Sequence, residues 1–112
     1  MSDDRDLLEY ILSQIEILQS YLVDVDEDLF LRNDVLRDAC MMKVVVIGEY
    51  SSKLSNELKT RFSEVEWQLL KSARNYYVHA YGFVNWRRVW ETLSEYIPDL
   101  KVKIEKMIPQ IG

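Results

Sequence analysis

The chain has 112 residues, of which 48% are hydrophobic and 29% are charged, a composition typical of globular rather than disordered proteins. Three glycines and two prolines provide too few turn residues for a β-sandwich or an alternating βαβ fold. The net charge is −5, with eleven acidic and three basic residues in positions 1–40, which excludes a uniformly basic nucleic-acid-binding surface. Residues 41–112 contain eleven basic and eight acidic residues, which leaves room for a local basic patch.

The length predicts a single domain over residues 1–112. The only cysteine, Cys40, cannot form an internal disulfide, and we expect it to be a small buried residue on a helix in a reducing compartment. The first residues, MSDDRDLLEY, are acidic, unlike a signal peptide, and no apolar run approaches the ~20 residues that span a bilayer. We therefore expect a soluble, cytoplasmic protein without a membrane partner.

The first predicted element is a helix that begins at Ser2 or Asp3, either of which can cap it. Apolar residues at steps of three and four then form a helical stripe that needs a packing partner. The stripe consists of Leu8, Ile11, Ile15, Leu18 and Leu22. The segment VDVDEDLF interrupts this pattern and is predicted to be a connection, and a second helix is predicted from about Asp28 to Lys59.

The centre of that second helix, ACMMKVVVIG, is apolar on nearly every side. A helix that is apolar all round is buried all round, and in so short a chain this pattern favours a second protomer. The same segment also resembles a strand that enters a phosphate-binding turn. The nucleotide fingerprint requires several glycines, whereas Gly48 stands alone, so we interpret Gly48 as a point where two helices approach closely.

The remaining sequence predicts three more helices. The third lies within RFSEVEWQLLKSARNYYVHAYGF, with Ser63 as its cap, Glu66 completing a capping box, and Gly82 as its stop. A fourth begins near Asn85, and a last one has Pro98 in its first turn and ends at Pro109. The strand-like alternation in LKVKIEK is the competing interpretation there. We expect an all-α, up-down bundle of four or five helices with antiparallel neighbours.

The segment RNYYVHAY contains the only histidine of the chain, His79, five residues after Arg74. Successive helical residues turn by ~100°, so these two side chains diverge by roughly 140° on a straight helix. They converge only if the helix distorts, if the arginine wraps around it, or if two protomers share one cleft across a two-fold axis, which we favour.

Such a cleft suits phosphoryl transfer in RNA. The imidazole can exchange a proton with the ribose, the guanidinium can stabilise the charge on the phosphate, and Asn75 can orient either group. No metal site is indicated, since one histidine lacks clustered carboxylates or thiols. Taken alone, the spacing favours a structural role for His79, such as a hydrogen-bonded, partly buried side chain.

The segment resembles the R-x4-H-x-Y motif of HepT-like proteins, the toxin branch of the HEPN superfamily. VVVIGEYSSKLS and NWRRVWETLSEYIPDLKVKIEK resemble the same family, and the likeness covers residues 28–107. The resemblance implies a homodimeric helical bundle and a metal-independent endoribonuclease in which Arg74 and His79 are catalytic, with Asn75 as the supporting polar residue. It also implies a minimal nucleotidyltransferase antitoxin that uses ATP to transfer AMP to Tyr81, while the toxin itself needs no cofactor. Tyr76 and Tyr77 depart from the usual aliphatic residues of the motif.

Lys71, Arg87 and Arg88 are candidates for RNA binding, with Arg61 nearby, although exposed helix charges explain Arg87 and Arg88 equally well. The three tryptophans are predicted to be core residues rather than base-stacking platforms. The sequence therefore predicts a ribonuclease toxin of a toxin–antitoxin pair. The alternatives are a non-catalytic subunit that presents substrate to a nucleotidyltransferase, and an interaction bundle in which His79 only packs.

Overall fold

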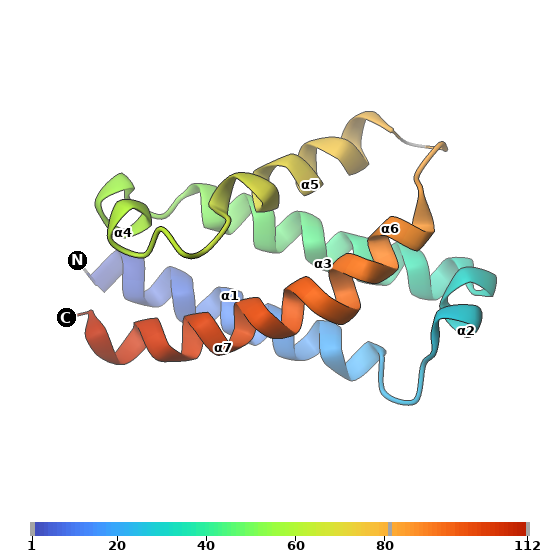
Figure 1. Ribbon diagram of the computed structural model, residues 1–112, viewed down its shortest axis with the longest axis horizontal. Coiled ribbons are helices and arrows are strands. Elements are labelled where there is room, and N and C mark those ends of the chain that lie inside the picture. Colours follow the sequence, from blue (N-terminus) through green and yellow to red (C-terminus); the bar gives the residue numbers. More distant parts are fainter. Residues whose placement is uncertain (1, 81, 112) are drawn as a thin grey trace.

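The computed structural model describes residues 2–80 and 82–111, and within these ranges it contains helices and turns but no strand. The helices are α1 (Ser2–Tyr21), α2 (Glu27–Arg32), α3 (Asp34–Ser52), α4 (Asn56–Arg61), α5 (Trp67–His79), α6 (Trp86–Glu91) and α7 (Ile97–Met107). The chain runs up and down the long axis of the molecule, and its two ends lie together at one end (Figure 1). The predicted all-α, up-down bundle is confirmed.

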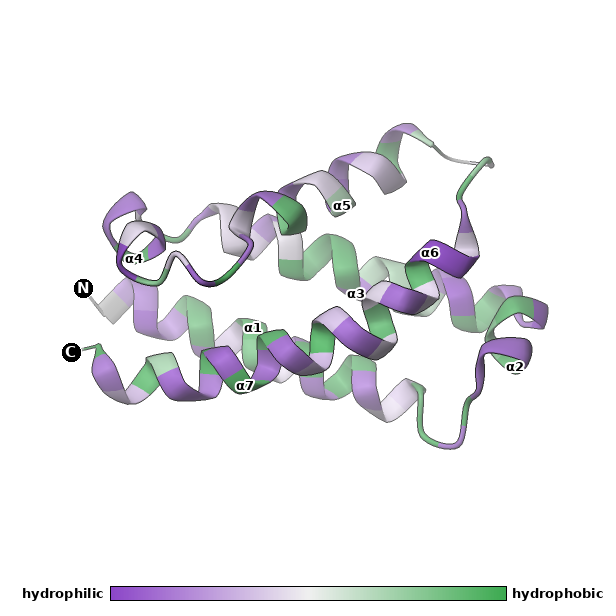
Figure 2. Cartoon of the chain, in the orientation of Figure 1, coloured by the Kyte–Doolittle hydropathy of each residue, from purple (hydrophilic) through white to green (hydrophobic). Residues whose placement is uncertain are grey.

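The bundle consists of α1, α3, α5, and a continuous rod that combines α6 and α7 (Figure 1). Helix α3 lies between α1 and α5, and α7 lies along α1. The predicted stripe of α1 forms much of the core, since Leu8, Ile11, Ile15 and Leu18 have no exposed surface. Figure 2 shows the hydrophobic residues of α1, α3 and α7 in stripes along helices whose other residues are hydrophilic, as amphipathic helices require.

The single helix predicted from Asp28 to Lys59 is wrong, because the chain forms three helices there. The Asn33 side chain accepts a hydrogen bond from the Leu36 amide at 3.0 Å and starts α3. The Ser55 hydroxyl accepts one from the Leu58 amide at 3.1 Å and starts α4. Such caps satisfy the free amides of a new helix and compete with continuation of the preceding one. Half of the predicted connection VDVDEDLF is also helical, since α2 begins at Glu27.

Helices α6 and α7 form one rod rather than the two separate antiparallel helices that were predicted. Asn85 caps α6 as predicted, with its side chain accepting a hydrogen bond from the Arg88 amide at 3.3 Å. A π-helical turn, Thr92–Tyr96, joins α6 to α7, and Pro98 lies in the first turn of α7. Proline lacks an N–H and crowds the carbonyl four residues earlier, so the wider turn lets the rod continue without that clash.

The tryptophans pack against the core, as predicted. The Phe30 ring of α2 lies 6.2 Å from that of Trp86 and 5.3 Å from that of Trp90, and these contacts dock α2 onto α6. Cys40 is fully buried, as expected, and burial raises the pKa of its thiol to about 11. In the described part of the chain, no helix combines the length and the apolar character needed to cross a membrane.

Candidate functional site

Helix α5 holds most of the predicted site, and its start differs from the prediction. It begins at Trp67 rather than after Ser63, and Glu66 precedes it without a side-chain capping bond. The turn before it is fixed from both sides instead. The Trp67 indole N–H donates to the Phe62 carbonyl at 3.1 Å, and the Tyr96 hydroxyl donates to the Glu66 carbonyl at 3.1 Å. Burial and the nearby carboxylates of Glu66 and Asp99 raise the pKa of Tyr96, so this donor stays protonated.

Gly48 brings α5 against α3, as the sequence predicted. A Cβ atom at this position would lie 2.7 Å from the carbonyl oxygen of Leu70 and 3.0 Å from Cβ of Arg74. Two helix backbones approach this closely only where one of them lacks a side chain. Gly48 therefore determines the distance between α3 and the part of α5 that bears Arg74.

Glu49, the residue after Gly48, holds the Arg74 side chain. Nε of Arg74 is shielded from solvent and lies 3.2 Å from Oε2 of Glu49, an ion-pair distance at an angle that does not form a hydrogen bond. Nη1 of Arg74 donates to Oδ1 of Asn75 at 3.0 Å. The arginine side chain is still 38% exposed, so the contacts orient a guanidinium whose Nη2 they leave for another acceptor.

His79 is exposed and is the last residue of α5. The helix stays α-helical up to this residue, and the Ala80 amide closes it by donating to the Tyr76 carbonyl at 2.8 Å. Arg74 is directed towards Glu49 of α3, and no hydrogen bond or ion pair joins it to His79, both residues being described. Neither a distorted helix nor a wrapped arginine therefore brings the two groups together within one chain.

Tyr81, the predicted modification site, lies outside the described residues, so its position relative to Arg74 stays a prediction. Gly82, predicted as the stop of the helix, follows three residues after its end and has a φ of +88°, a conformation that glycine adopts without strain.

The predicted basic residues lie in different places. Lys71 is exposed on α5, Arg87 forms an ion pair with Glu27 at 3.8 Å, and Arg88 lines a pocket between α3, α5 and α6. The expectation that Arg61 lies near them is wrong, because α4 is at the end of the molecule where the termini meet (Figure 1). Arg61 donates there to the Gln110 carbonyl at 3.0 Å and covers the Phe62 ring.

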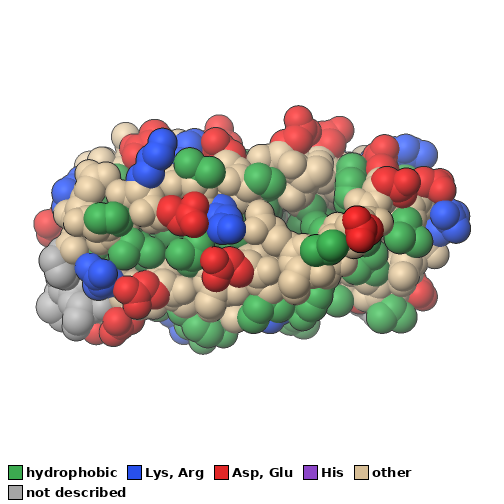
Figure 3. All heavy atoms as spheres, turned by 90° about the horizontal axis from the view of Figure 1, so that it is seen from below, with side chains coloured by type: hydrophobic (Ala, Val, Ile, Leu, Met, Phe, Trp, Pro, Cys, Tyr) green, Lys and Arg blue, Asp and Glu red, His purple; other side chains and the backbone are tan. Residues whose placement is uncertain are grey.

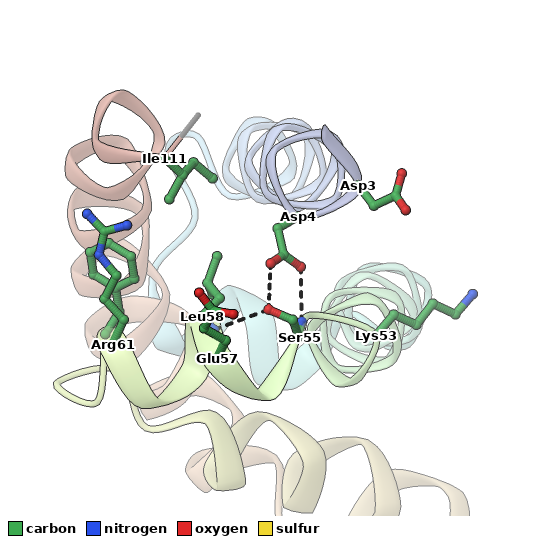
Figure 4. A pocket seen from close by; sticks show the side chains of 9 residues that line it. Asp3, Asp4, Lys53, Ser55, Glu57, Leu58, Arg61 and Ile111 are labelled. Atoms are coloured by element: carbon green, nitrogen blue, oxygen red, sulfur yellow. Dashed lines mark hydrogen bonds between the residues drawn. The ribbon is translucent and has the colours of Figure 1, made fainter. Parts of the chain in front are cut away.

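A hollow of about 470 Å³ surrounds Arg61 and includes acidic and basic side chains (Figure 4). The Asp4 carboxylate accepts hydrogen bonds from the Ser55 amide at 3.0 Å and from its hydroxyl at 2.6 Å. These hydrogen bonds attach α1 to the start of α4, so the polar groups of Asp4 and Ser55 have a structural role. The face opposite α5 mixes acidic and basic side chains among hydrophobic ones, so it has no continuous basic surface (Figure 3).

Sequence reasoning did not single out Glu49 or give Tyr76 a specific role. Glu49 had a detectable signal, since a carboxylate next to the glycine of a close helix contact lies opposite the facing helix. Tyr76 accepts a hydrogen bond from the Asn85 amide at 2.8 Å and so links the end of α5 to the start of α6. The sequence offers no signal for that contact, because it depends on the path of the segment between the two helices.

The fold and the site define a small helical bundle with an arginine oriented by a carboxylate and a histidine five residues later. The family model described as "Ribonuclease HepT-like" matches residues 11–107. The chain is 32% identical to a probable ribonuclease HepT of Thermococcus cleftensis, over 92% of this chain and 94% of that protein. It is 30% identical to a protein named as a putative RNase of Caldanaerobacter subterraneus, over 96% of each.

A protein named as a putative RNase of Methanocaldococcus jannaschii is 28% identical over 97% of this chain and 94% of its own length. No solved structure matches the chain significantly. The chain belongs to the HepT-like ribonuclease family.

Proposed function

We propose that the chain is a metal-independent endoribonuclease toxin that acts as a homodimer and is silenced by a nucleotidyltransferase antitoxin. The family and the names of its relatives support RNA as the substrate. The observation on which the proposal depends is the arrangement of α5, where Glu49 and Asn75 orient Arg74 while His79 stays exposed.

The reaction proposed for this site is transfer of the phosphoryl group to the adjacent 2′-hydroxyl. One imidazole removes the 2′-OH proton, the 2′-oxygen attacks the phosphorus, and the bond to the 5′-oxygen breaks. The leaving oxygen takes up a proton from water, so the products are a 2′,3′-cyclic phosphate and a 5′-hydroxyl, and the imidazolium returns its proton to solvent. In the proposed dimer, each site combines His79 of one protomer with Arg74 of the other. Arg74 stabilises the charge on the remaining phosphate oxygens.

A dimer is supported by the surface next to Arg74. Val35 and Met42 of α3 are 75% and 54% exposed, and with Glu49 they recur every seven residues along one face of that helix. Val78 of α5, 49% exposed, is four residues from Arg74. We call the exposed apolar residues Val35, Met42 and Val78 the α3–α5 face. On each helix a residue of the Arg74–Glu49 pair extends this face. A second copy on the α3–α5 face would cover the apolar residues and bring a second α5 near the first.

The function is tested by expression and by cleavage with purified protein. Wild-type protein is expected to stop growth and to cut RNA in the presence of EDTA, leaving 2′,3′-cyclic phosphate ends, whereas His79→Ala does neither. Gln68→Ala, which changes another exposed residue of α5, serves as the matched control and is expected to behave as wild type. A wild type that neither stops growth nor cleaves RNA would contradict the proposal and favour the docking-subunit alternative.

Silencing is proposed to occur by transfer of AMP to Tyr81, on the basis of its place in the motif. The tyrosine oxygen attacks the α-phosphate of ATP, pyrophosphate leaves, and the phenolic proton is lost. The new phosphate and base would block RNA at the site by size and by charge. Incubation with the proposed nucleotidyltransferase antitoxin and with ATP is expected to add one adenylyl group to the intact mass.

That mass gain should disappear in Tyr81→Phe and persist in Tyr77→Phe, which removes a neighbouring phenol. A gain that survives Tyr81→Phe would place the modification elsewhere, and no gain in the wild type would contradict this mode of silencing.

A further inference from the structure

A pocket of about 240 Å³ lies between α3, α5 and α6 and is distinct from the Arg74–Glu49 contact. Met41 and Val44 of α3 supply apolar side chains to it, and Tyr76 of α5 and Arg88 of α6 also line it. Small-molecule sites usually measure ~300–1,000 Å³, so this space suits a single ring system rather than a larger ligand.

The charges of this pocket favour an anion attached to an apolar group. Arg88 is the one charged residue among the described residues that line it, and it is exposed. The neighbouring Arg87 does not line the pocket, and its charge is balanced by an ion pair with Glu27 at 3.8 Å. In a chain with a net charge of −5, a lone guanidinium beside an apolar wall selects for a ligand with complementary charge.

Tyr76 provides a surface on which a base can stack. Its side chain is 41% exposed, and its hydroxyl is fixed by the Asn85 amide at 2.8 Å, so the ring needs little ordering when a ligand binds. Ser72 and Thr92 add hydroxyl groups to the wall, which can bond the polar edge of a base. Stacking on an aromatic ring combined with arginine contacts is the usual way in which proteins bind unpaired bases.

The pocket opens on the side of α5 that bears His79 rather than Arg74. On a helix, Tyr76 and Ser72 are within ~60° and ~20° of the direction of His79, whereas Tyr76 and Arg74 diverge by roughly 160°. Three residues of helix rise, about 4.5 Å, separate Tyr76 from His79 along the axis. A nucleotide whose base occupies the pocket therefore has its sugar and phosphate within reach of the exposed imidazole.

We propose that this pocket binds one base of the RNA beside the cleaved bond, stacked against Tyr76, with a phosphate on Arg88. The choice of a nucleotide over other anions with an apolar group rests on the proposed ribonuclease function. The pocket thus gives the enzyme a base preference that Arg74 and His79 do not provide.

The test uses a probe inside the pocket and needs no catalysis. Met41 lines the pocket, while Met107 is buried in α7 and is outside its lining, so methyl-labelled methionine distinguishes local binding from global change. His79→Ala protein is titrated with AMP, GMP, CMP and UMP and, as base-free controls, with ribose 5-phosphate and inorganic phosphate. The Met41 signal is expected to shift and saturate in the millimolar range with at least one nucleotide, and with neither control.

Three substitutions show where the nucleotide binds. Arg88→Gln is expected to raise the dissociation constant for that nucleotide about tenfold, and Ser72→Phe, which fills the pocket from an exposed position, is expected to abolish the shift. Arg87→Gln is the matched control and should leave the constant within about twofold, since Arg87 is outside the pocket. Equal urea midpoints for all variants would show that the folds are intact.

The proposal is overturned if Met41 responds to none of the four nucleotides. It is also overturned if Met41 responds equally to ribose 5-phosphate, or if the response survives Ser72→Phe. A response of Met41 only to the proposed nucleotidyltransferase antitoxin would assign the pocket to protein docking instead. The ribonuclease proposal is tested separately, by whether the wild type cleaves RNA. The ribonuclease proposal and the base-pocket proposal can therefore fail independently.

Discussion

Alanine in place of Arg74 or His79 is expected to lower RNA cleavage by roughly 10²- to 10⁴-fold, whereas a mixture of the two inactive variants is expected to regain activity. Each substitution removes a group that the proposed reaction needs, either the proton carrier or the cation beside the phosphate. Both side chains reach solvent, and neither belongs to the hydrophobic core, so the fold should persist. Far-UV circular dichroism and urea unfolding check that expectation.

The recovery follows from a site that two protomers share. On one α5 the two side chains diverge by roughly 140°, and the structure neither distorts the helix nor turns Arg74 towards His79. If each site combines Arg74 of one protomer with His79 of the other, a mixed dimer of the two variants has one intact site and one doubly defective site. Random pairing makes half of the dimers mixed, so about one quarter of the wild-type rate should return.

The test of the shared site needs a mixture of the two inactive variants that can exchange subunits, and a variant that cannot form a dimer. Co-expression of the two variants ensures exchange, and each variant alone gives the baseline. Met42→Asp places a charge on the α3–α5 face, where the side chain is 54% exposed in a single chain, so the monomer should fold while the dimer and the activity are lost. A mixture that stays at the baseline, or a fully active Met42→Asp monomer, would contradict the shared site.

Local patterns in the sequence predicted most of the fold. Four of the five residues in the predicted stripe are buried in α1, while Leu22 lies just after the helix and is partly buried, and Asn85 caps α6 as predicted. The wrong boundaries arose where capping side chains were overlooked. Asn33 and Ser55 divide the predicted second helix into three, because a cap competes with helix continuation even when the apolar spacing persists. Pro98 lies in the first turn of α7 as predicted, but a π-helical turn before it joins α7 to α6 without the expected link between separate helices.

The site could be predicted only in part. The motif selected Arg74 and His79, whose catalytic role stays a prediction, and the isolated Gly48 correctly indicated a close helix contact. Glu49 and the pocket at Arg88 depend on how α3, α5 and α6 pack, and a helix periodicity does not specify which faces meet. Arg61 was expected near the basic residues of the site, although α4 and the C-terminal end of α5 lie at opposite ends of the molecule (Figure 1).

Gly48→Ala is expected to destabilise the protein by about 1–3 kcal/mol, although the same change at an ordinary helix position stabilises by about 0.5–1 kcal/mol. The sign reverses because the new Cβ would lie 2.7 Å from the Leu70 carbonyl oxygen, a backbone atom that moves only with α5. The midpoint and slope of urea unfolding measure the change. Gly82→Ala provides a comparison in which backbone strain is the only expected cause of destabilisation. Nothing lies within 4 Å of the Cβ added there, and only the φ of +88° opposes the substitution.

Gly48→Ala should also lower RNA cleavage, because displacement of α5 moves Arg74, whose Cβ would be 3.0 Å from the new methyl group. A shift of about 1 Å at a catalytic group costs as much as 10²-fold in rate. Glu49→Gln distinguishes the effect of Arg74 orientation on the rate from an effect on the free energy of unfolding. It removes the charge beside Arg74 without adding volume, and this half-exposed ion pair contributes only ~0–1 kcal/mol to stability. Glu49→Gln is therefore expected to lower kcat without increasing KM, and to leave the midpoint of urea unfolding nearly unchanged. A Gly48→Ala protein that is more stable than wild type would show that α3 and α5 do not depend on this close approach.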